Sequence, residues 1–233
     1  MKIMYITDQI YLHGGVEKVL SQKANWFADK NGDEVWIITS RQENKKSVYN
    51  FSEKITFTDL EVNYDTSRSY FHPSNLAKVP GHYQKLKQML KKVKPDVVIS
   101  CNFAPDFYFL PSLLKGILKI KEFHGSRALL KPPVSKKEKF IESLNRRTEK
   151  AYDVLALLNP DEVKYYNSGN TVVIPNPAEQ DDGRTADLSQ KKVLAAGRIS
   201  PVKNFEALIE SWNKIAREHP DWQLHIFGED YLD

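Results

Sequence analysis

Cysteine is almost absent from the sequence. Cys101 is the only one among 233 residues, so no disulfide bond can form within the chain, and a reducing cytoplasmic compartment is expected. No apolar run approaches the roughly 18 residues that a membrane-spanning helix needs. The chain enters a strand-like segment, Lys2–Thr7, without a signal-peptide pattern before it. Cys101 itself ends an apolar run and is predicted to be a small buried residue.

Several chemical signatures are missing as well. No group of cysteine, histidine, aspartate and glutamate residues has the spacing of metal ligands, so no bound metal is expected. The sequence has neither a P-loop nor the G-x-S-x-G motif of α/β-hydrolases.

Charge is distributed unevenly along the chain. The formal net charge is +4, but residues 78–150 contain 17 Lys/Arg and 6 Asp/Glu, a net charge of +11, which leaves −7 for the remainder. This basic block suits a surface that faces phosphates, acidic polymers or an anionic membrane, and it equally suits a solvated helix face. Because Phe107–Phe109 fit an apolar helix pattern, nucleic acid is not expected as a partner.

Short β-rich runs alternate with amphipathic helical patterns. Runs such as Val35–Ile38 and Val154–Leu158 are apolar without alternation, which is typical of strands covered on both faces. The predicted strands are Lys2–Thr7, Glu34–Ser40, Ile55–Val62, Asp96–Cys101, Ile117–Phe123, Asp153–Leu158 and Thr171–Ile174. The succession predicts an α/β fold with a Rossmann-like parallel sheet and right-handed crossovers.

The composition changes after the seventh strand. We assign residues 1–177 to a first domain, 178–190 to a linker and 191–233 to the start of a second Rossmann-like domain, with strands at Lys192–Ala196 and Trp222–Phe227. A single strand–helix–strand unit cannot cover its own sheet, and an independent domain usually needs about 100 residues. We therefore expect a truncated chain whose last segment packs on the first domain or self-associates through an exposed apolar face.

Two loops carry residues suited to phosphate. Gly14 and Gly15 follow the first strand and open directly into a helix, where the backbone can approach a ligand closely, although a tight turn alone would also require glycine. Arg198 and Lys203 follow the strand that ends near Gly197, five positions apart at the start of a helix. Guanidinium and ammonium groups at the carboxyl edge of a sheet suit a diphosphate.

Two further positions follow predicted strands. His124 stands just after a strand and before Gly125, where a catalytic and a structural role are both open. Asn176 lies between two prolines in the segment Ile174–Pro177, which most simply fixes the direction of the chain.

These segments, taken in order, resemble glycosyltransferase family 4, whose members have the two-domain GT-B fold. The matching segments are His13–Glu17, Phe123–Gly125, Val173–Pro177 and Ala196–Asn204, followed by a helix at Phe205–Glu218 and a strand end at His225–Gly228. The resemblance implies transfer of a sugar from a nucleotide-sugar donor to a glycan or lipid-linked acceptor, with retention of configuration and without a metal. It also implies docking at the inner face of a membrane, by the basic helices of residues 83–94 and 135–150.

The resemblance assigns roles by position. Arg198 and Lys203 would hold the donor diphosphate, with Gly14 and Gly15 against it or the sugar, and His124 would lie near the transferred sugar as the catalytic candidate.

Two other residues of the matching segments, Glu17 and Asn176, are assigned to acceptor contact or support near the cleft. The family's glutamate pair, seven residues apart, would follow Asp233, and Glu229 comes too early to replace it, so the chain by itself is expected to be inactive. Two alternatives stay open: a non-catalytic module that binds carbohydrate or a membrane surface, and a GT-B sugar-nucleotide epimerase.

Overall fold

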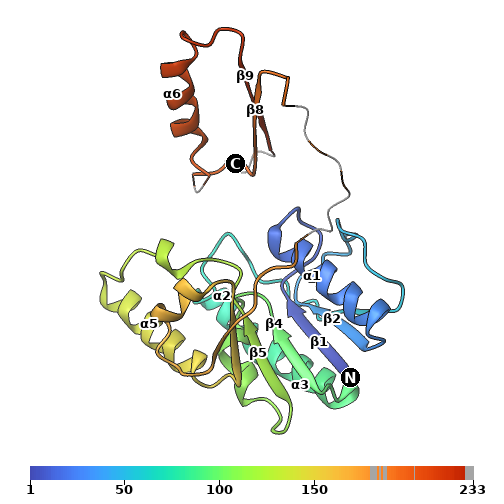
Figure 1. Cartoon of the computed structure of the whole chain (residues 1–233). Coiled ribbons are helices and arrows are strands. Elements are labelled where there is room, and N and C mark those ends of the chain that lie inside the picture. The colour runs from blue at the N-terminus through green and yellow to red at the C-terminus, as the bar shows by residue number, and fades with distance from the viewer. Residues whose placement is uncertain (179–182, 184, 186–187, 202, 229–233) are drawn as a thin grey trace. The chain divides into compact units, whose positions relative to one another are not determined.

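The chain forms two compact units, Met1–Ala178 and Glu179–Asp233. The computed structural model describes residues 1–178, 183, 185, 188–201 and 203–228 (Figure 1). Val202, Glu229 and much of the predicted linker lie outside the described residues, and the assignment of 178–190 to a linker stays a prediction.

A seven-stranded parallel sheet is the framework of the first unit. Its strands are β1 (Lys2–Thr7), β2 (Glu34–Thr39), β3 (Thr56–Asp59), β4 (Val97–Ser100), β5 (Leu118–Glu122), β6 (Val154–Leu157) and β7 (Thr171–Val173). They lie in the order β3-β2-β1-β4-β5-β6-β7, and every neighbouring pair is parallel. The predicted α/β fold with a Rossmann-like parallel sheet is confirmed.

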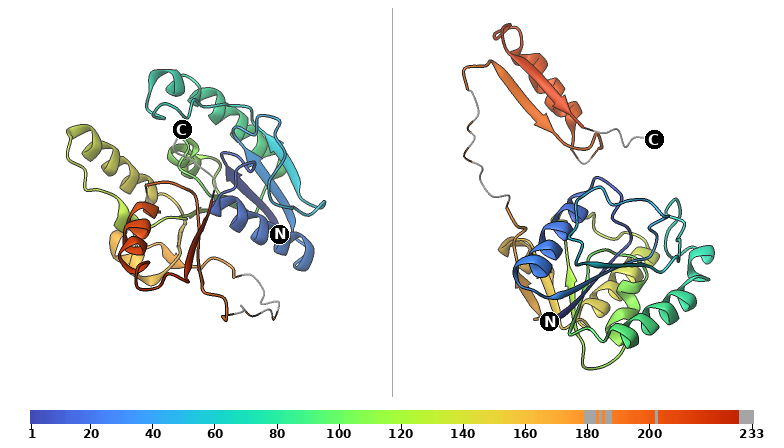
Figure 2. Two further views of the ribbon diagram at one scale, coloured as in Figure 1. Left: turned by 90° about the horizontal axis from the view of Figure 1, so that it is seen from above. Right: turned by 90° about the vertical axis from the view of Figure 1, so that its right-hand side faces the viewer.

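Helices cover both faces of this sheet. The helical segments are α1 (Gly15–Asn25), η1 (Trp26–Lys30), α2 (Pro73–Leu76), α3 (Val79–Val93), α4 (Asp106–Phe109), η2 (Leu110–Ser112), η3 (Arg127–Leu129), α5 (Lys136–Glu149) and η4 (Pro160–Tyr165). The two views of Figure 2 show α1, in blue, and α3, in green, on opposite sides of the strands.

Strand alternation divides the apolar core in two. Tyr5 and Ile99 face α1 and pack with Leu20 and Ala24, whereas Ile6 and Val98 face the other way, into a cluster that includes α3. Successive strand residues point to opposite faces, so a residue's parity decides which helix it contacts.

The third strand is shorter than predicted. The expected range was Ile55–Val62, but regular pairing ends at Asp59. Glu61 and Asn63 adopt positive φ values of 48° and 54°, so the backbone leaves the extended conformation there. The amides of Leu60 and Val62 still donate to carbonyls of the β2 end, at 2.8 and 2.9 Å.

The second unit contains β8 (Lys192–Ala196), α6 (Phe205–Ile215) and β9 (Gln223–Phe227), and its two strands pair in parallel. None of the described side chains of α6 is buried, and Leu194, Ile209 and Phe227 are 68%, 54% and 57% exposed. The apolar stripe predicted for this helix is therefore present without a layer covering it among the described residues.

The sequence predicts a buried Cys101 and no membrane-spanning helix. Cys101 is 4% exposed, which confirms its predicted burial. Across the described ranges, no helix combines the length and the apolar character that crossing a bilayer requires.

One buried histidine makes the stability of the first unit depend on pH. His82 in α3 is 1% exposed, and its Nδ1 lies 3.0 Å from the Tyr64 hydroxyl. Burial, with a smaller contribution from Lys85, lowers the pKa of His82 from 6.5 to about 4. Between these values the unfolded chain binds more protons, so the neutral histidine contributes stability above pH 6.5 that is lost as the pH falls towards 4.

We therefore expect the free energy of unfolding of the first unit to fall by about 3 kcal/mol between pH 7 and pH 4 because of His82 alone. Urea unfolding across this range, compared with His82→Gln, isolates the contribution, since the amide does not titrate. His13→Gln, at an exposed position of the same unit, serves as the control. Equal pH slopes for the wild type and His82→Gln would contradict the assignment.

Candidate functional site

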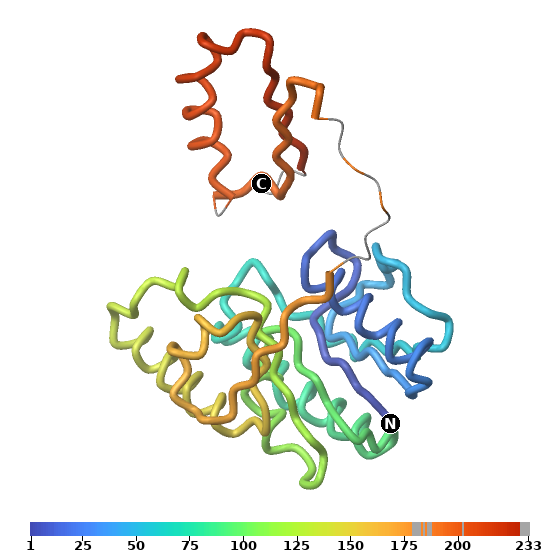
Figure 3. Tube along the Cα trace, viewed as in Figure 1, coloured from blue at the N-terminus to red at the C-terminus, as the bar shows by residue number. Residues whose placement is uncertain are grey.

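The carboxyl ends of the parallel strands meet at one edge of the first unit. Strand order reverses between β1 and β4, because β2 lies on one side of β1 and β4 on the other. Ligands of open α/β sheets bind outside the carboxyl ends at this position. The trace in Figure 3 leads from the ends of β1, β4 and β5 into the loops 8–14, 101–105 and 123–126, which form this edge.

The loop after β1 is shaped by Gln9, Gly14 and Glu17. The Gln9 side chain accepts hydrogen bonds from the amides of Tyr11 and Leu12, at 2.7 and 3.0 Å, and donates to the Glu17 carboxylate. A Cβ atom on Gly14 would lie 2.0 Å from Glu17 Oε2. A side chain at position 14 would therefore require the Glu17 carboxylate to move away. Glu17, 8% exposed, supports the loop from within.

The helix start beside this loop is open. Among the residues that the structure describes, no side chain caps α1 and an added Cβ on Gly15 would meet no atom within 4 Å. Gly15 is exposed at this helix start, where the amides of the first turn have no intrahelical partner, and the predicted binding of an anion there stays a prediction. The two adjacent glycines thus differ in their surroundings: a side chain at position 14 would meet Glu17, whereas one at position 15 would meet open space.

His124 lies beyond β5 with only 8% of its side chain exposed. Its Nε2 is 3.4 Å from Glu122 Oε2, while Glu122 Oε1 accepts a hydrogen bond from Lys23 of α1 at 2.9 Å. Burial acts to raise the pKa of Glu122, but the contacts with His124 and Lys23 together outweigh it, so the pKa is lowered. Neither ring nitrogen of His124 has a well-aligned hydrogen bond among the described residues.

Cys101 belongs to the same group of side chains. Cys101, Glu122 and His124 each offer one ligand-type atom, and these atoms lie within 4.8 Å of one another. Sequence spacing does not reveal this group, because Cys101 is 21 positions from Glu122. Because Ser100 pairs with Lys121 in parallel strands, the residues that follow them, Cys101 and Glu122, lie side by side.

Two further buried titratable side chains, Lys121 and Asp106, belong to the opposite face of the sheet. The ammonium group of Lys121 donates to the Ser100 and Asn102 carbonyls and lies 4.7 Å from the Phe103 ring centroid. Asp106, 1% exposed, contributes the opposing charge. Burial lowers the pKa of Lys121 and raises that of Asp106. A charged residue in a strand covered on both faces was the available sequence signal, since such a charge must find partners.

The loop after His124 is tied down by buried glutamates. Arg127 pairs with Glu149, which is 2% exposed, and its amide donates to Glu162 at 2.8 Å. The Ser126 hydroxyl also donates to Glu162. These contacts hold the segment that follows Gly125, so the position of His124 does not depend on Glu122 alone.

The second unit presents its predicted cations at the corresponding edge of its own sheet. Arg198 lies two residues after the end of β8 and is exposed. Side-chain carbons of Lys203 lie 3.6 Å from the Cβ position of Gly197, so this lysine stem packs over the strand end. Asn204, with φ of 51°, begins α6 and makes no side-chain cap. Lys203 therefore directly precedes the N-cap residue of α6.

The remaining predicted residue is distant from the centre of the sheet. Asn176 is exposed and follows β7, the edge strand. Within the first unit the structure places Gly14, Gly15 and Glu17 after β1 and His124 after β5, but Asn176 beyond the far edge.

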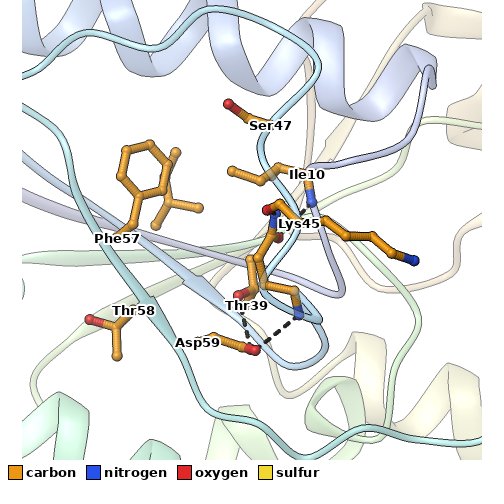
Figure 4. A pocket seen from close by; sticks show the side chains of 9 residues that line it. Ile10, Thr39, Lys45, Ser47, Phe57, Thr58 and Asp59 are labelled. Atoms are coloured by element: carbon orange, nitrogen blue, oxygen red, sulfur yellow. Dashed lines mark hydrogen bonds between the residues drawn. The ribbon is translucent and has the colours of Figure 1, made fainter.

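Cavities lie beside the loop after β1 and beside α5. One, of about 230 Å³, lies between Ile10, Phe57 and the Thr39–Asp59 hydrogen bond of 3.0 Å (Figure 4). It is below the roughly 300–1,000 Å³ of small-molecule sites, so it does not suit a whole nucleotide sugar. The other, of about 770 Å³, lies between α5 and the segments 127–134 and 164–167.

The sequence profile of glycosyltransferase family 4 matches residues 13–193. The chain belongs to glycosyltransferase family 4. A curated relative, an uncharacterized glycosyltransferase of Haemophilus influenzae, is 24% identical over 97% of this chain. The chain spans 62% of the length of that relative.

Solved glycosyltransferases share the fold. A point mutant of TarM from S. aureus, in complex with Fondaparinux, alpha-GlcNAc-glycerol and UDP, matches with a TM-score of 0.71 and 12% identity, over 100% of this chain and 73% of that chain. The lipopolysaccharide outer core galactosyltransferase WaaB, in its apo form, matches with a TM-score of 0.64 and 19% identity, over 100% and 62%. The resemblance to a GT-B glycosyltransferase is therefore confirmed, whereas the roles of individual residues stay predictions.

The two glycines of the first loop provide a matched pair for testing the geometry of this family 4 chain. Gly14→Ala is expected to lower the free energy of unfolding by about 1–2 kcal/mol, because the methyl group displaces the Glu17 carboxylate from Gln9. Gly15→Ala should change it by less than about 1 kcal/mol, since the added carbon meets nothing.

Urea unfolding of the double variant Gly14→Ala/Glu17→Ala completes the cycle. Without the carboxylate the methyl group has room, so the double variant should lose less stability than the sum of the two single changes. Additive losses, or equal effects of the two glycine substitutions, would show that Gly14 and Glu17 do not contact each other.

Proposed function

We propose that this chain is part of a glycosyltransferase that moves a sugar from a nucleotide-sugar donor to a hydroxyl group of a glycan or a lipid-linked acceptor. Membership of glycosyltransferase family 4 supports the reaction class. The observation that carries the proposal is the placement of Lys203 over Gly197, at the carboxyl end of β8 and at the start of α6. Cations and helix amides at a strand end suit the phosphates of a nucleotide.

The chemistry follows from the charge of the leaving group. The bond between the anomeric carbon and the phosphate oxygen breaks, and a bond from that carbon to the acceptor oxygen forms. Arg198 and Lys203 neutralise the charge that develops on the leaving diphosphate, so no resident metal is needed. In the retaining reaction that we propose, a leaving phosphate oxygen accepts the proton of the acceptor hydroxyl.

Residues of the first unit act on the acceptor side. His124, fixed by the loop tied to Glu162 and by the Glu122 contact, is proposed to face the transferred sugar. The amide of Gly15 and the open start of α1 are proposed to face the donor phosphates. Glu17 is assigned to support, because Gln9 and Gly14 enclose it, and Asn176 is not assigned to the sugar.

Binding of a nucleoside diphosphate tests the proposed donor site. Arg198→Ala should weaken the binding of UDP, GDP or ADP, whichever binds most tightly, at least tenfold, because a bidentate charged contact is lost. Lys203→Ala should weaken it several-fold. Isothermal titration at fixed ionic strength measures both effects. Lys214→Ala removes the same charge from the other end of α6 and should leave the affinity unchanged.

Equal effects of Lys203→Ala and Lys214→Ala would show that Lys203 attracts the nucleotide only through the overall charge of the chain. The proposed site would then have no basis. The same titration distinguishes a transferase from a non-catalytic module, and a second assay identifies an epimerase. A non-catalytic module would bind anionic vesicles or polymers but no nucleotide. An epimerase would convert a nucleotide sugar without any acceptor, which analysis of the donor pool detects.

We also propose that the first unit docks on anionic membranes through the 129–140 surface. This surface consists of exposed apolar and basic side chains: Leu129, Leu130, Lys131, Val134, Lys136, Lys137, Lys139 and Phe140. The four apolar members are between 66% and 84% exposed. Apolar side chains enter the interface while lysines contact lipid headgroups.

Of the two basic helices predicted to dock on a membrane, α5 suits this role better than α3. No large apolar side chain of α3 is among the strongly exposed ones, so that helix offers charge without an apolar anchor. Its lysines therefore suit a solvated face. The lipid-facing surface is consistent with a lipid-linked acceptor, and the cavity beside α5 lies next to it.

Vesicle co-sedimentation distinguishes the two helices. The triple change Lys136→Glu, Lys137→Glu and Lys139→Glu should reduce binding to phosphatidylglycerol vesicles at least tenfold, since each basic residue contributes about 1 kcal/mol. The same change at Lys87, Lys91 and Lys92 of α3 is the matched control and should have a much smaller effect.

The combination Leu129→Ser, Leu130→Ser and Phe140→Ser should reduce the binding that persists at high salt, because salt screens only the charged contribution. Equal losses from the α3 and α5 charge changes would point to unspecific attraction and reject the 129–140 surface.

A further inference from the structure

Three potential ligand groups converge between the sheet and α1. The paired ends of β4 and β5 place Cys101 beside Glu122, and His124 follows two residues later on the same face. One atom from each side chain lies within 4.8 Å of the others. All three side chains are at least nine-tenths buried.

Unsatisfied polar atoms point to a missing partner in this cluster. Neither ring nitrogen of His124 makes a well-aligned hydrogen bond among the described residues, although Nε2 lies 3.4 Å from Glu122 Oε2, and the hydroxyl of Tyr5, which is 0% exposed, has no partner there either. Tyr5 pairs with Ile99 across the strands and so faces the same side as Cys101. Buried polar groups without partners are rare and usually indicate an ion, a water molecule or a ligand.

We propose that Cys101, Glu122 and His124 form a binding site for a soft divalent cation such as Zn²⁺. The Sγ atom of Cys101, Oε2 of Glu122 and a ring nitrogen of His124 would provide three ligands, and a water molecule or an anion would provide the fourth. Thiolate, carboxylate and imidazole are the ligand types that zinc prefers.

The charges and the surrounding contacts fit a doubly charged ion. A thiolate and a carboxylate together neutralise its two charges. Glu122 Oε1 keeps its hydrogen bond to Lys23, which leaves Oε2 as the ligand and orients the carboxylate. The Lys23 ammonium group opposes a nearby cation, so moderate affinity is expected. Burial keeps Cys101 as a neutral thiol before binding, because it raises the pKa of the thiol.

Binding therefore forms a metal–sulfur bond and releases the thiol proton to solvent. Tetrahedral zinc separates its ligand atoms by about 3.5 Å, so the group needs to contract by roughly 1 Å when the ion enters. Side-chain rotation of Cys101 and His124 is sufficient for such a change.

An ion at this site would remove His124 from the transferred sugar. The site is thus an inhibitory one, a consequence that rests on the proposed role of His124 in transfer. Binding itself does not depend on that role. Failure of metal binding would leave the nucleotide titration unaffected, so the two proposals are tested separately.

Cobalt absorption tests the site without any activity assay. Co²⁺ added to the tag-free chain should produce, at one equivalent, a thiolate-to-cobalt charge-transfer band that Zn²⁺ abolishes. Because Cys101 is the only cysteine, this band can arise from no other residue. Cys101→Ser should eliminate it, and His124→Asn and Glu122→Gln should weaken the Co²⁺ affinity at least tenfold. His13→Asn, an exposed histidine, should not change the affinity.

Two results would overturn the proposal: no thiolate band at stoichiometric Co²⁺, as expected if a water molecule fills the space, or a band with unchanged affinity in His124→Asn. Circular dichroism verifies that each variant is folded. Should Cys101→Ser fail to fold, His124→Asn decides alone, because that side chain makes no well-aligned hydrogen bond that folding requires.

Discussion

Parallel pairing of β4 with β5 is the constraint on which the candidate site of the first unit depends. The register Ser100–Lys121 sends Lys121 to the α3 side of the sheet and its successor Glu122 to the α1 side. Each charge then meets partners on its own face: carbonyls and aromatic rings for Lys121, and Lys23 for Glu122. A slip of one residue would exchange the two faces and bury both charges unpaired.

The consequence of this pairing is a rigid edge. Removing one member of a buried ion pair leaves an uncompensated charge, which is far more costly than losing a surface contact. Arg127 with Glu149 and Glu122 with Lys23 therefore fix the loops that carry Gly125 and His124. A rigid edge suits a site in which a sugar must be held in a defined orientation, because positioning contributes much of the rate enhancement of group transfer.

The order of elements was accessible from the sequence because apolar runs and stop signals are local. Six of the seven strands of the first sheet lie within a residue or two of the expected ranges, and the third ends early at the positive φ of Glu61. Non-local contacts were not accessible. Nothing in the sequence indicates that Glu17 folds over Gly14, or that Cys101 meets Glu122. The charges of Lys121 and Glu122 inside a buried strand were the one available hint.

Charge balance explains why the donor phosphates are assigned to the second unit. Near the edge of the first unit, Lys23 and Arg127 are paired with glutamates, Lys121 donates to carbonyls, and Arg41 lies against Asp8 and Glu43. These cations are already neutralised or solvated by the protein, so they contribute little additional attraction to a diphosphate. Lys203, in contrast, has no ion-pair partner within the described part of the chain and stands beside helix amides. A diphosphate bound there gains interactions that the unliganded chain does not already satisfy, which is the requirement for selective binding of an anion.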